Sequence, residues 1–124
     1  MKKFRFRQFQ VYQDAIQFRQ ELKKLSKVRF SKDEQYCLTS QMWRALDSIV
    51  LNIAEGSDRS TDKDFANFLN MAHTSLNEVV ACLDLALNDK YIADAEHMEY
   101  LNKAEEMANQ LTAFRRKLLH DSKK

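Results

Sequence analysis

Side chains able to carry catalysis or bind a metal are few in this sequence, and their spacing matches none of the usual patterns. The three histidines are His73, His97 and His120. A di-iron helical bundle needs two Glu-x-x-His pairs plus two more carboxylates, and only Asp94-x-x-His97 resembles one half-site. No phosphate-binding loop, zinc-ligand spacing or Ser-His-Asp order occurs. We therefore expect a protein that is not an enzyme and has no metal or cofactor.

The two cysteines, Cys37 and Cys82, are far apart and lie inside helical patterns. Buried, reduced thiols of a cytoplasmic protein are the favoured interpretation, and a disulfide is the alternative. No run approaches the roughly 18 apolar residues of a transmembrane helix, and the basic start lacks the apolar core of a signal peptide. We expect a cytoplasmic protein with no membrane partner.

Basic side chains concentrate near the chain start, the middle turn and the chain end. In an up-down-up-down bundle these segments share one pole, with a predicted net charge of +6, against zero at the other pole and +2 for the chain. Phosphate contacts and stacking of bases on Phe4, Phe6 and Phe9 would suit nucleic acid there. Solvated tails and phenylalanines that pack on the bundle are the alternative. The candidate nucleic-acid residues are Lys2, Lys3, Arg5, Arg7, Arg59, Lys63, Arg115, Arg116 and Lys117.

The elements that must position these residues are helices. With 124 residues, one glycine and no proline, the chain lacks the turn-formers that sheets and long loops require. Apolar residues recur at steps of three and four, which predicts helices over about 8–26, 31–55, 61–88 and 94–119. We expect a single all-α domain over residues 1–124. The short connections favour an antiparallel up-down-up-down four-helix bundle.

Local signals mark where the predicted helices begin and end. Ser31-Lys32-Asp33-Glu34 reads as a capping box that opens the second helix. In the stretch "NIAEGSDR", Gly56 reads as the C-cap of that helix, in the left-handed conformation that glycine enters without steric cost. Ser60 or Thr61 then caps the third helix, and Asp94 caps the fourth.

The second and third helices carry more apolar side chains than one buried stripe needs. Leaving several large ones in water would forgo roughly 1.5–3 kcal/mol for each. We therefore expect a homo-oligomer. The alternative is a compact monomer whose own core buries these extra apolar side chains. The candidate interface residues are Trp43, Arg44, Leu46, Val50, Leu51 and Met71.

A polar ladder follows one face of the second helix and can pair with polar residues of the third. The favoured interpretation is a hydrogen-bonded seam that fixes the register between helices or subunits. A polar ligand site is the alternative. The candidate seam residues are Gln41, Ser48, Asn52, Glu55 and Glu78.

Several rigid spacings agree with one known pattern over most of residues 6–92. The matching residues are Glu34, Tyr36, Leu38, Gln41, Arg44, Ala45, Ser48, Ile49, Asn52–Gly56, Phe65, Phe68, Leu69, Ser75, Glu78, Tyr91 and Ile92. The chain thereby resembles the small bacterial four-helix-bundle proteins named after the 23S rRNA intervening sequence. Three residues depart from this pattern. Trp43 stands where the family has the first Arg of an Arg-Arg pair, Ser31 where it usually has Pro, and Thr74 where it frequently has Gly.

The resemblance implies an antiparallel four-helix bundle that forms ring-like homopentamers. A structurally similar group, the accessory proteins of diversity-generating retroelements, binds a reverse transcriptase and nucleic acid. Two hypotheses follow: an oligomeric protein that binds RNA or DNA through its basic pole, and a protein scaffold or reverse-transcriptase accessory subunit without direct nucleic-acid contact.

Overall fold

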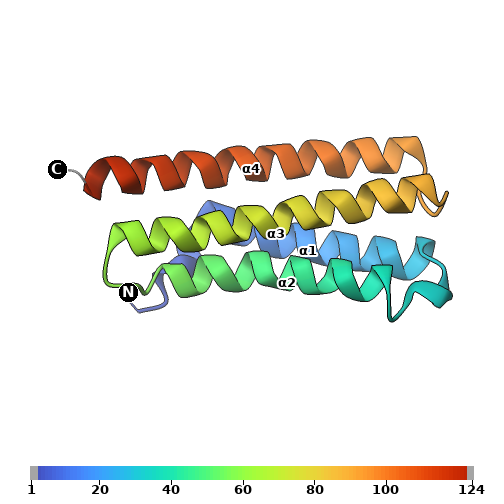
Figure 1. Cartoon of the computed structure of the whole chain (residues 1–124), viewed down its shortest axis with the longest axis horizontal. Coiled ribbons are helices and arrows are strands. Elements are labelled where there is room, and N and C mark those ends of the chain that lie inside the picture. Colours follow the sequence, from blue (N-terminus) through green and yellow to red (C-terminus); the bar gives the residue numbers. More distant parts are fainter. Residues whose placement is uncertain (1–2, 123–124) are drawn as a thin grey trace.

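The computed structural model describes residues 3–122, which form four long α-helices and two short 3-10 turns and contain no strand. The all-α prediction is confirmed. The elements are η1 (Arg5–Gln8), α1 (Gln10–Arg29), η2 (Lys32–Glu34), α2 (Leu38–Gly56), α3 (Asp62–Asn88) and α4 (Asp94–Ser122). Figure 1 shows the chain start, the α2–α3 turn and the chain end at one end of the molecule, with the other two connections at the opposite end.

One core runs through the bundle because each helix contributes an apolar stripe at helical spacing. In α1 the stripe is Val11, Ala15, Phe18 and Leu22, all at most 4% exposed. The third helix packs most extensively, lying against both α2 and α4. No helix of the described residues is both long and apolar enough to cross a membrane.

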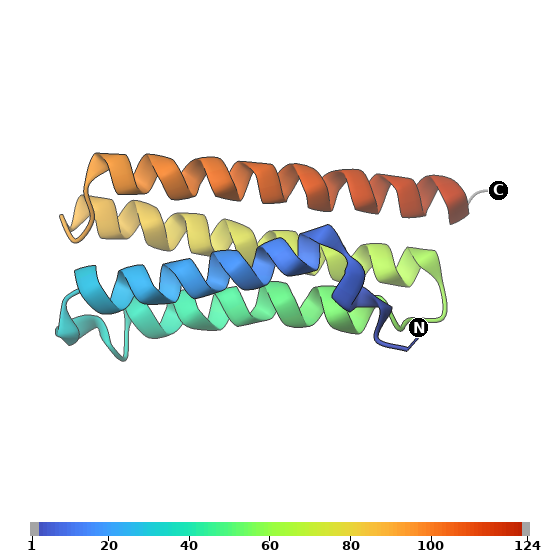
Figure 2. The ribbon, with the colours of Figure 1, turned by 180° about the vertical axis from the view of Figure 1, so that it is seen from behind.

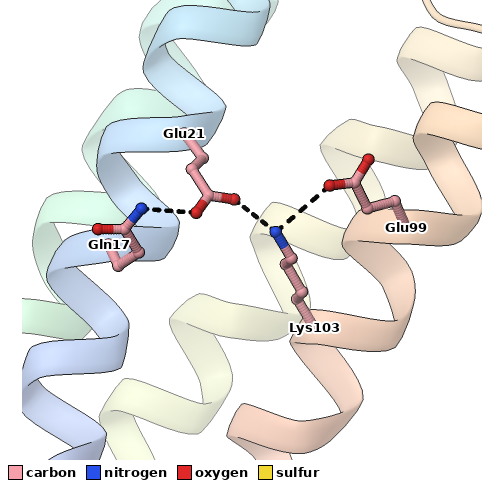
Figure 3. Close-up of polar contacts among 4 residues, drawn as sticks. All are labelled: Gln17, Glu21, Glu99 and Lys103. Atoms are coloured by element: carbon pink, nitrogen blue, oxygen red, sulfur yellow. Dashed lines mark hydrogen bonds and ion pairs between the residues drawn. The ribbon is translucent and has the colours of Figure 1, made fainter.

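The α1–α4 contact includes a charged cluster. Lys103 of α4 donates to Glu21 of α1 at 2.6 Å and to Glu99 at 3.3 Å, and Gln17 donates to Glu21 at 2.7 Å (Figure 3). The hydrogen bond from Lys103 lowers the pKa of Glu21, and the same bond raises the pKa of Lys103. Charge pairing thus supplements apolar burial along this side of the bundle.

The second helix begins at Leu38, not at Ser31, so the predicted capping box is wrong. The Ser31 hydroxyl accepts the N–H of Asp33 at 3.2 Å within η2. The Glu34 carboxylate accepts the Tyr91 hydroxyl at 2.8 Å, which raises the pKa of Tyr91 to about 12. Glu34 therefore ties η2 to the segment that follows α3.

The left-handed cap predicted at Gly56 is also wrong, because Gly56 is the last residue of α2 and has no positive φ. A Cβ at this position would lie 2.6 Å from the Phe68 Cβ and 2.9 Å from Cδ1 of Phe65. Glycine is required here by the close approach of α3. Among the described residues, the left-handed residue at the C-terminal end of a helix is Lys90, with φ 65°, just after α3.

The two remaining predicted caps have different outcomes. The Thr61 hydroxyl accepts the N–H of Asp64 at 3.1 Å, which confirms Thr61 as the cap of α3. Asp94 is instead the first residue of α4. Ala93 precedes it, with its carbonyl bonded to His97 N–H and its own N–H donated to the Glu96 carboxylate at 2.9 Å. That backbone bond lowers the pKa of Glu96.

Candidate functional site

The predicted basic pole lies at the end of the bundle where the N-terminal segment packs beside the α2–α3 turn (Figure 2). We call it the basic end. Its basic residues are Lys3, Arg5, Arg7, Arg59, Lys63, Arg115, Arg116 and Lys117. With Glu55, Asp58, Asp62, Asp64 and Asp121 against these eight, the described part carries a net charge of +3. Lys2, also predicted, lies outside the described residues, as do Lys123 and Lys124.

Two of the cations are engaged in holding this end together. Arg5 donates to the Ser57 carbonyl at 3.1 Å, and its guanidinium lies 5.7 Å from the ring centroids of Phe9 and Phe65. Arg59 pairs with Asp64 at 3.0 Å and, more loosely, with Glu55 at 3.9 Å. These two arginines fasten the N-terminal segment and the start of α3, so less of their charge is available to a ligand.

Five other cations are exposed and have no carboxylate within 4.0 Å in the described part of the chain. They are Lys3, Arg7, Lys63, Arg116 and Lys117. Arg115 differs, because it is half-buried between α3 and α4. Unpaired surface cations concentrated at one end create a positive potential that attracts polyanions.

The three N-terminal phenylalanines have separate roles. Phe9 packs against the rings of Phe65 and Phe114, with centroids at 6.1 and 5.2 Å, and so belongs to the bundle. Phe6 packs edge-on against Tyr12 at 4.9 Å. Phe4 is 63% exposed and has φ 60°, an uncommon conformation for a residue with a Cβ. Phe4 packs edge-on against Phe6, with centroids at 6.4 Å, but is the most exposed of the three and the one that offers a ring face for stacking.

Two hollows open at the basic end. The larger, about 820 Å³, lies between the N-terminal segment and the end of α2, and its walls include Phe4, Arg5, Glu55 and Asp58. The other, about 430 Å³, is lined by α4 alone. Its walls are Thr112, Arg115, Arg116, Leu119 and His120. Because no carboxylate lines it, the α4 hollow suits an anion better than the larger one does.

The predicted oligomer interface is only partly at the surface. Leu46 is 1% exposed and belongs to the bundle's own core, and Val50 is half-buried against that core. Trp43 is also half-buried, donating its ring N–H to the Ser26 hydroxyl at 2.8 Å. The assignment of Leu46 is wrong because the bundle's own helices cover it. Trp43 and Val50 keep part of their surface exposed, and their assignment stays a prediction. The exposed members are Arg44, Leu51 (64%) and Met71 (50%).

The polar seam between α2 and α3 is shorter than predicted. The hydroxyls of Ser48 and Ser75 are 2.8 Å apart, and the Asn52 amide donates to the carbonyl and hydroxyl of Ser48 at 2.8 and 3.0 Å. Ser75, the α3 partner of Ser48 in this seam, was not among the predicted seam residues. Gln41, Glu55 and Glu78 are exposed, and none of them bonds to a neighbouring helix within the described residues.

The residues considered for catalysis are dispersed. His97 lies 2.7 Å from the Asp84 carboxylate, bridging α3 and α4. Burial raises the pKa of the Cys82 thiol to about 11. The prediction that Cys37 is buried is wrong, because it lies in the break before α2 and is exposed; both thiols are free. In residues 3–122, no three His, Cys, Asp or Glu side chains form a metal-binding group.

Sequence reasoning also missed Asn70 and His73 of α3, which line a small cavity with Thr112 and Arg115 of α4. Within each pair the second residue follows the first by three positions, so both side chains of a pair lie on the same face of their helix. Polar residues at that spacing, beside a core stripe on both helices, are the signal that could have indicated the cavity.

Comparison with known proteins agrees with the fold. A crystal structure of a protein of unknown function from the S23 ribosomal protein family of Bacteroides thetaiotaomicron superposes with a TM-score of 0.77 at 25% identity, covering 85% of this chain and 97% of that one. A search of curated proteins finds no match. Residues 7–113 match the sequence model of the 23S rRNA-intervening sequence proteins. Since that match spans most of the chain, the protein belongs to the 23S rRNA-intervening sequence protein family.

Proposed function

We propose that this protein is a non-enzymatic nucleic-acid-binding or accessory protein that contacts RNA or DNA through the basic end. The observation that carries the proposal is the group of exposed, unpaired cations there, Lys3, Arg7, Lys63, Arg116 and Lys117. Such cations bind phosphates by displacing condensed counterions, which requires no base-specific contact. Exposed Phe4 beside them offers a ring on which a base can stack.

The test compares two triple variants that remove equal charge from opposite ends. Arg7→Gln, Arg116→Gln and Lys117→Gln neutralise the basic end, and Lys24→Gln, Lys27→Gln and Lys32→Gln, all exposed, are the matched control. Binding of a fluorescent single-stranded RNA is measured by anisotropy at low salt. We expect the first variant to lose at least about tenfold in affinity and the control to stay near wild type. Equal losses, or no binding by the wild type, would contradict the proposal.

We further propose that the chain forms an antiparallel up-down-up-down bundle that self-associates, as a pentameric ring, through α2 and α3. Exposed Leu51, Met71 and Leu85 on these helices support self-association, because soluble monomers usually cover large apolar side chains. Sedimentation equilibrium at micromolar concentration tests this. A five-subunit mass is expected, and a single species of 14.6 kDa would overturn it.

The second candidate is a protein scaffold or an accessory subunit of a reverse transcriptase without direct nucleic-acid contact. The same exposed apolar residues favour it, since they can equally serve a different protein partner. Capture of a reverse transcriptase by a wild type that binds no RNA at low salt would favour this function over the first.

A further inference from the structure

Arg115 carries a polar atom that the protein itself leaves unsatisfied. Its Nε is buried and has no hydrogen-bond partner, alone among the buried side-chain nitrogens and oxygens of the described residues. A buried N–H without a partner is costly, so native proteins nearly always supply one from protein, water or a bound ion. A guanidinium stays charged in proteins, so deprotonation does not remove the cost.

The cavity beside Arg115 is built from hydrogen-bonding groups over an apolar floor. Asn70 and His73 from α3 face Thr112 and Arg115 from α4 across about 110 Å³, and Leu69 and Leu111 complete the lining. Both leucines are at most 1% exposed, so the floor is apolar, whereas Asn70 and Thr112 are exposed to solvent. Hydrogen bonds and charge interactions are stronger beside apolar surroundings than in open water.

The charge and size of the cavity select the ligand. A guanidinium donates only, and neither this cavity nor the adjoining α4 hollow has a carboxylate in its walls. A metal cation is therefore disfavoured and an anion favoured. The cavity of about 110 Å³ has the volume of about three or four water molecules at roughly 30 Å³ each. That space suits one tetrahedral group with several acceptor oxygens. Arg115 and Thr112 also line the α4 hollow, which gives the cavity an opening toward Arg116 and His120.

We propose that Asn70, His73, Thr112 and Arg115 form a phosphate-binding site, with the Arg115 guanidinium as its principal donor. The ligand is either a free phosphate or a phosphate of a nucleic-acid backbone, since both present the same oxygens. The site stands independently of the proposed function, because a bound inorganic phosphate alone would satisfy Arg115.

The first experiment titrates inorganic phosphate into the ¹⁵N-labelled full-length protein, with sodium chloride of equal ionic strength as the control titration. We expect saturable shifts at Asn70, His73 and Thr112 with phosphate and not with chloride. The key variant is Arg115→Gln, and Lys24→Gln is its control, since it removes one positive charge from an exposed residue at the opposite end of the bundle. Phosphate affinity should fall at least about tenfold in R115Q and less than about threefold in K24Q.

If R115Q does not fold, Thr112→Val replaces it, because this change keeps the side-chain shape and removes one donor; a loss of at least about threefold is expected. Shifts that chloride reproduces, or equal losses in R115Q and K24Q, would overturn the site.

A final arm distinguishes the two sources of phosphate. If the ligand is a backbone phosphate, inorganic phosphate competes with single-stranded RNA, and R115Q weakens RNA binding more than K24Q. Saturable phosphate binding without RNA binding keeps the site and identifies the ligand as free phosphate, while contradicting the proposed function. RNA binding with no phosphate-specific shifts overturns the site and leaves the proposed function standing.

Discussion

Replacing Gly56 with alanine tests how tightly α2 and α3 meet at the basic end. The new methyl carbon would lie 2.6 Å from the Phe68 Cβ and 2.9 Å from Cδ1 of Phe65. Carbon atoms in contact prefer about 3.5–4.0 Å, so α3 must move away by about 1 Å. A rotamer change cannot relieve the closer contact, because the Phe68 Cβ is attached to the α3 backbone.

The expected loss follows from two opposing effects. Overpacking of a well-packed contact costs roughly 1–3 kcal/mol. Replacing a helical glycine by alanine regains up to about 1 kcal/mol of helix propensity, and less at the last position of α2. We therefore expect Gly56→Ala to lower the free energy of unfolding by about 1–2 kcal/mol.

Urea unfolding of the wild type, Gly56→Ala and Gly56→Asn separates this explanation from a left-handed cap. Asparagine tolerates the left-handed conformation better than alanine does, so a cap would make the asparagine variant the more stable of the two. Steric exclusion predicts the reverse, because asparagine is larger. An alanine variant as stable as the wild type, or an asparagine variant more stable than the alanine one, would refute the packing argument.

Three further predictions concern stability and thiol chemistry. Lys90→Gly should raise the unfolding free energy by about 1 kcal/mol, since Lys90 has φ 65°; an unchanged urea midpoint would contradict this. Glu21→Gln should cost less than about 1 kcal/mol at pH 7. Because the hydrogen bond from Lys103 lowers the pKa of Glu21, that difference should be full above the ordinary value of 4.5 and disappear as the pH falls further below it; a pH-independent difference would argue against the pairing. In a thiol-reagent assay of the native protein, exposed Cys37 should react at once and buried Cys82 only on unfolding; two fast thiols would contradict this.

Helix number and much of the core could be predicted from sequence, because apolar spacing is a local property. In α1, Val11, Ala15, Phe18 and Leu22 recur at steps of four, three and four, and each is buried. Properties set by a neighbouring helix were predicted less well. Sequence reveals that residue 56 is glycine, but only packing reveals that Phe65 and Phe68 leave no space for a Cβ.

The same reason explains the errors at the candidate surfaces. Leu46 was assigned to an interface because a helical wheel shows how far the apolar face extends but not how much of it the same chain covers. Cys37 was placed inside a helix because the break between η2 and α2 contains neither glycine nor proline. The charges at the basic end were predictable from chain topology alone. The unsatisfied Nε of Arg115 was not, since it depends on side-chain packing between α3 and α4.

The salt dependence of RNA binding tests the central claim most directly. Anisotropy titrations of a single-stranded RNA at salt concentrations between about 50 and 200 mM give the slope of log affinity against log salt, roughly −0.7 for each phosphate neutralised. If the basic end is the contact surface, the wild type gives a steep negative slope, and the R7Q/R116Q/K117Q variant reduces its magnitude by about 2. An absence of binding at 50 mM salt, or a slope that the triple variant leaves unchanged, would contradict the account.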